Sequence, residues 1–272
     1  MTSEHLKISV VTVCYNAAET IEETMLSVLN QTYPNIEYII IDGGSTDGTV
    51  DIIKKYANRL AYWVSEPDKG IYDAMNKGIK VVTGEYVNFM NAGDSFFTST
   101  TISDAVKQFD NYDFIGGIAA YRKRRKILYS FWKPVKTNYS FNDVCHGKIV
   151  NHQSSFIRKR ILSDGYDLSY KIIADELLFI NKIAIMGNSY KRINTIIALY
   201  DITGISNTKN IGLTVRNERM DFLKKNIPLS ILKDYKMPLY KKILRKSWHI
   251  IEPLKSVVNR ILIYRPSFIL GD

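Results

Sequence analysis

The sequence predicts an α/β fold in which a largely parallel sheet is flanked by helices. Two observations support this prediction. Apolar, β-branched segments such as residues 8–13 and 37–41 alternate with helical segments, as parallel strands alternate with their crossover helices. Clusters of polar residues follow three predicted strands, at residues 12–16, 42–47 and 91–94. Because ligands of such sheets bind at the carboxyl ends of strands, these clusters predict a binding site along one edge.

The N-terminal part follows this alternation element by element. Strands are predicted at residues 8–13, 37–41, 61–64 and 86–90. Helices are predicted from Thr20 to near Pro34, and at residues 50–56 and 70–82. Thr20 and Glu23 have the spacing of a capping box, in which both side chains would satisfy backbone amides at the start of the first helix.

The pattern changes after residue 110. Further strands are predicted at residues 114–120, 127–131, 155–158 and 189–200, with a basic turn at 122–126 and a helix at 176–186. Beyond Gly212 the apolar spacing becomes helical, and Pro253 is expected to break or kink that segment. The predicted division is an α/β domain at residues 1–210 and a basic helical C-terminal extension at 211–272.

The positive charge of the chain is unevenly distributed. The 272 residues carry a formal net charge of +10, and 46% of them are hydrophobic, which is enough for a packed core. From Gly212 to Asp272 there are 13 Lys and Arg against 5 Asp and Glu, so the rest of the chain is nearly neutral. This distribution argues against a nucleic-acid-binding protein, which would be basic throughout its binding domain.

Cysteine usage and the N-terminus bear on the compartment. Cys14 and Cys145 form neither a CxxC pair nor a disulfide framework, which indicates free thiols in a reducing compartment. The first residues lack the basic and apolar regions of a signal peptide. No run of about 18 apolar residues predicts a transmembrane helix. We therefore expect a cytoplasmic protein.

Two carboxylates lie in loops rich in glycine. Asp42 follows a predicted strand and precedes two glycines, so it could accept hydrogen bonds from a ring N–H or ribose hydroxyls while the glycines let a ligand approach. The alternative is an ordinary Asx turn. Asp68 lies between Pro67 and Gly70, where it either contacts a ligand or caps the following helix.

Two further carboxylates have a structural and a chemical interpretation. Asp94 follows the strand predicted at 86–90, where a lone carboxylate can hold Mg²⁺ together with substrate phosphates or simply form a turn. Asp175 precedes the apolar run at 177–180. There it is either stabilised by the helix dipole or serves as a general base.

Five motifs follow one another in a characteristic order. They are Val11-Thr12-Val13-Cys14-Tyr15-Asn16, Ile41-Asp42-Gly43-Gly44-Ser45-Thr46-Asp47-Gly48-Thr49, Asp68-Lys69-Gly70, Ala74-Met75-Asn76-Lys77-Gly78 and Asn88-Phe89-Met90-Asn91-Ala92-Gly93-Asp94. This order resembles family 2 glycosyltransferases, and most of all the bacterial branch that builds capsule, O-antigen and colanic-acid repeat units. The resemblance is strong over residues 6–100 and looser over 150–185. It implies a GT-A fold, a Rossmann-like mixed sheet flanked by helices, with residues 1–210 as the catalytic domain.

The resemblance also implies a role for each motif. The residues implied to bind the nucleotide are Thr12, Tyr15, Asn16, Asp42, Asp68, Lys69 and Asn91. Asp94 is implied to hold Mg²⁺ or Mn²⁺ on the diphosphate, and Asp175 to act as the catalytic base. His152 and Gln153 resemble the segment that lines the acceptor side.

Two positions depart from the family pattern. The usual Asp-x-Asp-Asp motif is Asn-Ala-Gly-Asp here, so only Asp94 keeps its carboxylate. Met75 stands where many relatives carry Arg. One phosphate contact of the family is therefore expected to be missing, or to be replaced by Lys69 or Lys77.

The implied reaction is an inverting displacement at the anomeric carbon. Asp175 would deprotonate the acceptor hydroxyl, and the cation would neutralise the departing diphosphate. The expected donor is a UDP-linked hexose or N-acetylhexosamine, with GDP-sugars as the other donor class of this branch. The implied acceptor is a glycan on a polyprenyl diphosphate at the inner leaflet, where the basic turn and tail would meet an anionic membrane surface.

Two functions of other classes stay open. The eroded acidic motif is compatible with an inactive module that binds a nucleotide-sugar, and the basic tail with a scaffold at the membrane surface. A nucleotidyltransferase would need a Gly-rich phosphate loop after the first strand, which residues 15–18 do not provide. No nucleic-acid-binding motif accompanies the charge, so no nucleic-acid partner is expected.

Overall fold

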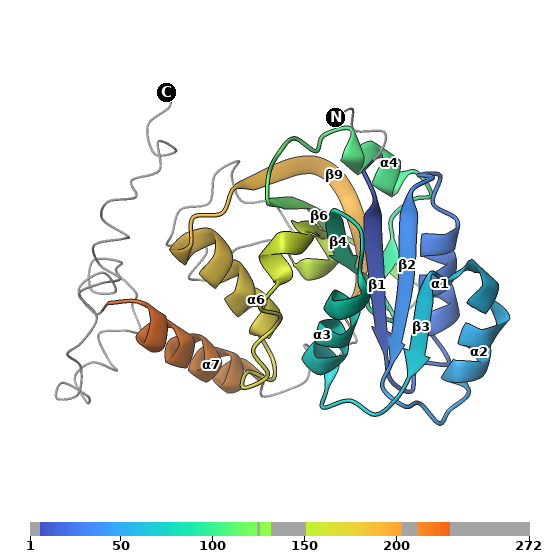
Figure 1. Ribbon diagram of the computed structural model, residues 1–272, viewed down its shortest axis with the longest axis horizontal. Helices are drawn as coiled ribbons and strands as arrows, with labels where there is room; N and C mark the ends of the chain where they lie inside the picture. The colour runs from blue at the N-terminus through green and yellow to red at the C-terminus, as the bar shows by residue number, and fades with distance from the viewer. Residues whose placement is uncertain (1–5, 124–125, 132–150, 203–210, 229–272) are drawn as a thin grey trace.

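The computed structural model describes residues 6–123, 126–131, 151–202 and 211–228 (Figure 1). Its strands are β1 (Ile8–Cys14), β2 (Ile36–Asp42), β3 (Tyr62–Ser65), β4 (Tyr86–Phe89), β5 (Ser95–Phe96), β6 (Phe114–Lys123), β7 (Lys126–Phe131), β8 (Ser155–Arg158) and β9 (Tyr190–Asp201). Its α-helices are α1 (Ile21–Leu29), α2 (Thr49–Lys55), α3 (Ile71–Val81), α4 (Thr101–Val106), α6 (Ala174–Phe179) and α7 (Ile211–Asn226). A π-helix at Ile180–Ile185 continues α6, and a short 3-10 helix, η3, spans His152–Ser154.

The described strands form one mixed sheet in the order β3-β2-β1-β4-β8-β6-β9-β5, with β7 paired to β6. β3, β2, β1 and β4 run parallel to one another, and β8 joins β4 antiparallel. β6 is antiparallel to β8 and parallel to β9. The predicted α/β fold with a parallel N-terminal half is therefore confirmed. The short elements β5 and α4 were not predicted.

Both faces of β1 and β2 are covered by helices. Val11 and Ile39 belong to a core cluster shared with α3, α6 and α7, whereas Val10 and Ile40 belong to a cluster shared with α1, α2 and α4. Successive side chains of a strand point to opposite faces, so a doubly covered strand has to be apolar throughout. Each fully buried isoleucine stabilises the fold by roughly 2 kcal/mol relative to an exposed one. Figure 1 shows α3 on one side of these strands and α1 and α2 on the other.

The predicted capping box at the start of α1 is wrong. Thr20 occupies the N-cap position, but its side chain makes no capping hydrogen bond. The acidic side chains of the first turn are used elsewhere: Glu22 accepts from the Tyr56 hydroxyl at 2.8 Å, and Glu23 pairs with Arg122. These contacts tie α1 to α2 and to β6, so the sequence pattern indicated the helix start but not the partners.

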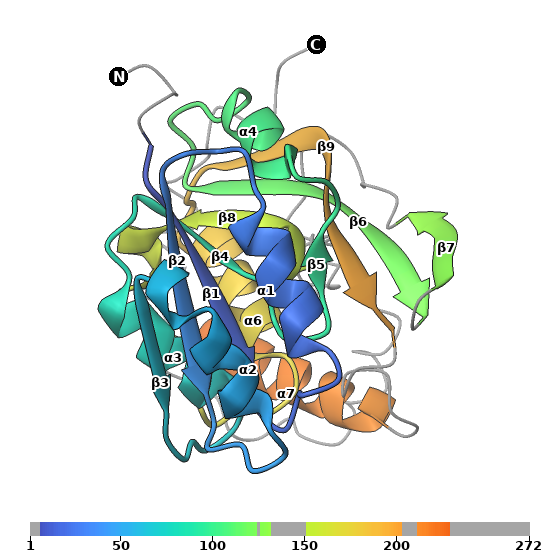
Figure 2. The ribbon, with the colours of Figure 1, turned by 90° about the vertical axis from the view of Figure 1, so that its right-hand side faces the viewer.

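The first helix of the predicted C-terminal extension packs on the same core as helices α3 and α6. Phe222 and Leu223 of α7 lie in the cluster that contains Tyr72 of α3 and Leu177 of α6. Figure 2 shows α7 beside α6, at the end of the molecule away from α4. The helical spacing predicted beyond residue 228, including the kink at Pro253, lies outside the described residues. Among the helices that are described, none is long and apolar enough to cross a membrane.

Candidate active site

The carboxyl ends of the parallel strands meet at one edge of the sheet. In the strand register Cys14 lies opposite Asp42, and Asp42 lies opposite Ser65. The chain leaving β4 stays close to β1, because the amide of Ala92 donates to the carbonyl of Val13 at 3.1 Å. The polar clusters after these strands therefore form one continuous surface, as the sequence predicted.

Asp42 holds the loop after β2 in place. Its carboxylate accepts from the amides of Gly44 and Ser45 at 3.1 and 2.9 Å, and from the hydroxyls of Ser45 and Ser65 at 2.5 and 2.6 Å. Burial opposes ionisation, but these hydrogen bonds prevail and hold the pKa of Asp42 below its ordinary value. Because Asp42 is fully buried, it organises the edge rather than presenting a free carboxylate to a ligand.

Asn16 joins the loop after β1 to the loop after β2. The backbone amide of Asn16 donates to the Ser45 hydroxyl at 2.7 Å, and its side-chain oxygen accepts from the backbone amide of Thr46 at 3.0 Å. Among the described non-glycine residues Asn16 alone has a positive φ, of 47°. Asn tolerates this left-handed conformation better than most residues, which explains its use at this turn.

Tyr15 and Asp68 converge over Gly43. The Tyr15 side chain is 64% exposed, an unusual exposure for an aromatic ring. A Cβ placed on Gly43 would lie 2.4 Å from Oδ2 of Asp68 and 3.4 Å from Cδ2 of Tyr15. The other oxygen of Asp68 accepts from the amide of Gly70 at 2.7 Å, so Asp68 binds the backbone at the start of α3 with one oxygen and holds the other beside Gly43. Only glycine at residue 43 leaves room for this arrangement.

The two candidate phosphate-binding lysines differ in their environment. The Lys77 ammonium pairs with Glu66 at 2.8 Å and donates to the carbonyl of Pro67 at 2.8 Å. Lys69 is exposed at the rim beside Asp68. Met75 is fully buried in the core, so its side chain does not reach the surface at which an arginine could bind phosphate. Lys69 is therefore the better placed of the two lysines.

Thr12, which the resemblance implied to bind the nucleotide, lies in the core of the sheet. Its side chain is fully buried, and its hydroxyl shares a hydrogen bond of 2.9 Å with the hydroxyl of Tyr38. β1 continues for two residues beyond Thr12 before the loop begins. Thr12 therefore has no surface available to a nucleotide, and its polar group supports the neighbouring strand instead.

A chain of hydrogen bonds crosses the floor of the site. Nδ2 of Asn91 lies 2.9 Å from Nε2 of His152, Nδ1 of His152 lies 2.7 Å from one Asp175 oxygen, and the Tyr72 hydroxyl donates to the other at 2.8 Å. With Nδ1 protonated towards Asp175, Nε2 accepts from Asn91. The loop after β4 is thus linked through η3 to the start of α6.

Asp175 is held as an ionised carboxylate in a largely buried position. Burial works against its charge, but the hydrogen bonds from His152, Tyr72 and the backbone of Glu176 together hold its pKa below the ordinary value. Its side chain keeps 20% exposure. An ionised carboxylate that still reaches solvent meets the geometric requirement for a general base.

Asp94 is buried, and both of its carboxylate oxygens are bonded within the protein. One of its oxygens accepts from Nε2 of Gln153 at 2.8 Å and the other from the amide of Asp201 at 2.9 Å. Burial raises its pKa to about 6 against the opposing effect of these hydrogen bonds. Gln153, implied to line the acceptor side, therefore contacts the implied metal ligand and is 3% exposed.

The oxygens around Asp94 could coordinate a cation only together with oxygen atoms from a bound ligand. Oδ1 of Asn91 and Oε1 of Gln153 are buried and have no hydrogen-bond donor in the described part of the chain. Oxygens are the ligands that Mg²⁺ and Mn²⁺ accept, and Mg²⁺ is commonly bound through one or two carboxylates plus substrate phosphates. No cluster of three or more His, Cys, Asp or Glu forms within the described ranges. Asp94 with Asn91 thus fits a cation that arrives with a diphosphate.

The side chain of Arg122 is buried, contrary to the prediction of a basic turn at residues 122–126. It is only 6% exposed. Its guanidinium pairs with Glu23 and donates to the carbonyl of Gly93, directly behind Asp94. The sequence does not indicate this inward orientation, because Arg122 is the first of five consecutive basic residues. Arg124 and Arg125 of the same turn lie outside the described residues.

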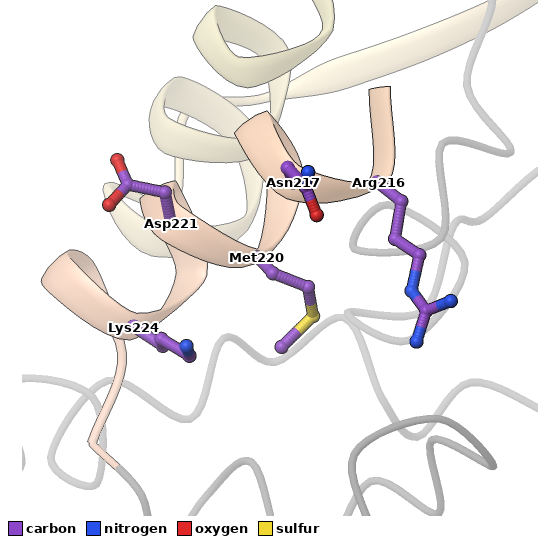
Figure 3. A pocket seen from close by; sticks show the side chains of 5 residues that line it. All are labelled: Arg216, Asn217, Met220, Asp221 and Lys224. Atoms are coloured by element: carbon purple, nitrogen blue, oxygen red, sulfur yellow. The ribbon is translucent and has the colours of Figure 1, made fainter. Parts of the chain in front are cut away.

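A separate cavity of about 470 Å³ lies against α7 (Figure 3). The described residues that line it are Arg216, Asn217, Met220, Asp221 and Lys224. All of them come from one helix, and none belongs to the edge described above.

Comparison with known proteins gives consistent results. A family model described as Glycosyl transferase family 2 matches residues 9–165. A Mycobacterium tuberculosis protein described as an uncharacterized glycosyltransferase is 32% identical over 203 residues, which cover 73% of this chain and 76% of the relative. A PGL/p-HBAD biosynthesis glycosyltransferase of Mycobacterium bovis is 26% identical over 212 residues, covering 74% and 79% of the two chains.

Solved structures resemble the fold at low sequence identity. S. aureus TarS 1-349 in complex with UDP-GlcNAc superposes with a TM-score of 0.66 at 19% identity, covering 89% of this chain and 74% of that chain. In another crystal structure of S. aureus TarS the match covers 89% of this chain but only 44% of that chain. The mannosyltransferase PcManGT of Pyrobaculum calidifontis, in complex with GDP-Man and Mn²⁺, gives 0.56 at 20% identity, covering 95% and 68%.

Proposed function

Because the chain belongs to glycosyl transferase family 2, we propose that it transfers a sugar from a UDP-linked donor to a hydroxyl of a glycan, with inversion at the anomeric carbon. Its helix-covered mixed sheet is the GT-A fold. The observation that carries the proposal is the hydrogen-bonded chain from Asn91 through His152 to Asp175. It connects a proton acceptor to the edge where the strands' polar loops meet.

The donor nucleotide occupies the surface formed by Tyr15, Asp68 and Lys69. The exposed ring of Tyr15 offers a face on which a base stacks. The Asp68 carboxylate beside it accepts hydrogen bonds from base or ribose, and Lys69 meets the diphosphate. Asn16 and Asp42 act through the loops that they hold. UDP is the first choice because TarS, a protein of the same fold, has been solved with UDP and with UDP-GlcNAc.

Asp175 serves as the catalytic base. It removes the proton of the acceptor hydroxyl while that oxygen forms its bond to the anomeric carbon, and the bond to the diphosphate breaks with its electrons leaving on UDP. General-base assistance of this kind accelerates a reaction by about 10²–10⁴-fold. His152 and Tyr72 orient the carboxylate and keep it ionised.

A divalent cation, Mg²⁺ or Mn²⁺, would be held by Asp94 and Asn91. When bound it neutralises charge on the departing diphosphate. Gln153 and Arg122 orient this part of the site through Asp94 and Gly93. PcManGT, a further protein of this fold, was solved with Mn²⁺.

The acceptor is a glycan, carried on a polyprenyl diphosphate, in the synthesis of a bacterial surface polysaccharide. Two relatives support this class by name: the PGL/p-HBAD biosynthesis glycosyltransferase and, over 35% of this chain, a putative teichuronic acid biosynthesis glycosyltransferase of Bacillus subtilis. The uneven positive charge of residues 212–272 suits the anionic inner face of a cell membrane, where the cytoplasmic enzyme would meet such an acceptor.

A second candidate function is a nucleotide-sugar-binding module without turnover. The observation in its favour is Asp94, whose two oxygens both accept hydrogen bonds from the protein. Such a module would bind the nucleotide with or without a divalent cation and would release no UDP.

Calorimetry with UDP, GDP, CDP and dTDP, first with Mn²⁺ and then with EDTA, tests the donor site. We expect UDP to bind most tightly, and more tightly with Mn²⁺. Tighter binding of GDP than of UDP would indicate a GDP-sugar as the donor. Equal affinity for UDP with Mn²⁺ and with EDTA would contradict the proposed role of the cation. No binding of any nucleotide would overturn the proposed function.

A further inference from the structure

Helix α7 contacts the backbone that leads to Asp175. The carboxylate of Glu218 accepts from the amide of Lys171 at 2.7 Å and from the amides of Ile172 and Ile173 at 3.1 Å each. These three residues immediately precede α6, which carries Asp175 in its first turn. One side chain of α7 therefore fixes three consecutive peptide groups next to the proposed base.

This contact holds the segment that leads into α6, a helix without a side-chain cap of its own. Ile173 occupies the N-cap position, and its side chain makes no capping hydrogen bond. Backbone amides at a helix start need an acceptor, and a carboxylate near that end is favoured by the helix dipole. Glu218 supplies the carboxylate from a segment more than forty residues further along the chain.

A second contact of α7 reaches the residue after the base. Nε and Nη2 of Arg219 donate to the two oxygens of Glu176 at 2.5 and 2.7 Å. Both side chains are largely buried, with 22% and 18% exposure. Burial raises the pKa of Glu176, and Arg219 works against that rise. Arg219 thus balances a negative charge that lies one residue from Asp175.

The helix itself is firmly seated, so these contacts have a fixed frame. Phe222 and Leu223 are buried in the core that includes α3 and α6. The hydroxyl of Tyr170 donates to Asp221 at 2.9 Å, and its ring packs edge-on against Phe222. α7 therefore contacts residues 170–173, before Asp175, and Glu176, directly after it.

We propose that Glu218 and Arg219 are positioning residues for Asp175, and that α7 is part of the catalytic unit. α7 lies beyond residues 9–165, which the family model matches. The inference rests on the proposed function in so far as Asp175 is the base. Its structural part, that α7 holds the start of α6, is independent of that function.

Hydrogen exchange of the segment 171–176 and release of UDP from UDP-sugars test the proposal together. In Glu218→Gln and Arg219→Gln the segment should exchange about tenfold faster or more, as expected for loss of one charged hydrogen bond. The kcat for UDP release should fall about tenfold. The KM for the donor should stay within about twofold, because α7 does not contact the donor surface. Lys224→Gln, an exposed charge change on the same helix, should leave all three quantities unchanged.

A double variant separates positioning from general destabilisation. Adding Glu176→Gln to Arg219→Gln removes the uncompensated charge, so kcat should recover at least partly even where the melting temperature does not. Unchanged exchange and unchanged kcat in the single variants would overturn the proposal, as would faster exchange with wild-type kcat. If the wild-type protein binds UDP but releases none from any donor, the proposed function fails, and the exchange result still decides whether α7 holds α6.

Discussion

Tyr15 is the residue on which the proposed preference of the site for a nucleotide depends most directly. A tyrosine that is 64% exposed at the end of a buried strand has a large free face and neighbours the Asp68 carboxylate. All nucleobases can stack on such a ring, because each has a π-face. The adjacent carboxylate can distinguish between bases by the hydrogen bonds that it accepts. The combination suits a nucleoside better than a bare sugar.

Replacement of that ring tests the assignment. Tyr15→Ala should weaken UDP binding about tenfold or more, because base stacking on an aromatic side chain contributes about 1–3 kcal/mol. Tyr62→Ala is a matched control, since Tyr62 is also exposed, at 42%, but lies at the opposite end of its strand from Ser65. Isothermal titration with UDP measures both. Equal affinities of wild type and Tyr15→Ala would remove the stacking platform.

Individual residues also mark where sequence reasoning stopped. Asp175 and Asp94 could be named because the motifs around them resemble those of family 2 glycosyltransferases, whereas their positions alone also fit a helix start and a turn. The partners of these carboxylates could not, since His152 reaches Asp175 across the fold and Arg122 turns inward from a basic run. Long-range pairing of this kind leaves no local pattern. The roles of the site residues remain predictions until they are tested by substitution.

At the scale of elements, Glu37 ties β1, β2 and the entry of β4 together. Its buried carboxylate accepts from the Ser9 hydroxyl and the Thr83 amide at 2.6 Å each, and pairs with Lys7 at 3.0 Å. Burial opposes its charge, but the hydrogen bonds prevail and lower its pKa to about 2. The parallel strands that shape the binding edge are thereby fixed at their amino-terminal ends.

Glu37→Gln should destabilise the fold in a pH-dependent way. The folded pKa of Glu37 lies below the unfolded value, so its contribution is complete above the unfolded pKa and is lost as the pH falls towards the folded one. The free energy of unfolding should decrease by up to roughly 3 kcal/mol at pH 7, with a smaller difference towards pH 3. Urea unfolding from pH 7 to pH 3 measures this, with the exposed Glu85→Gln as control. A difference independent of pH would contradict the electrostatic explanation.

The elements with strong periodicity were predicted well, and the irregular ones were not. The strands at 8–13, 37–41 and 86–90 and the helix at 70–82 lie within a residue or two of β1, β2, β4 and α3. Their apolar runs reflect burial on two faces, which the sequence displays directly. The two-residue β5 has too little pattern to detect, and the capping box failed because tertiary contacts of Glu22 and Glu23 replaced it.

On the scale of the whole molecule, the charge of residues 212–272 predicts attachment to anionic surfaces. Each Lys or Arg near such a surface contributes about 1 kcal/mol, and the attraction falls with ionic strength. The protein should therefore co-sediment with phosphatidylglycerol-containing vesicles at low salt and be released at high salt. Neutral phosphatidylcholine vesicles are the control. Absence of binding to the anionic vesicles at low salt would remove the membrane from the proposed function.

The proposed donor surface lies on β1 to β3 and the proposed proton acceptor on α6, and a hydrogen-bonded chain from Asn91 to Asp175 links the loop after β4 to that acceptor. UDP release from UDP-sugars by wild type and Asp175→Asn tests this account most directly. We predict that the variant binds UDP as wild type does but has a turnover rate at least about 10²-fold lower. Asp51→Asn, on the surface of α2, should behave as wild type. Turnover by Asp175→Asn within about tenfold of wild type would contradict the account.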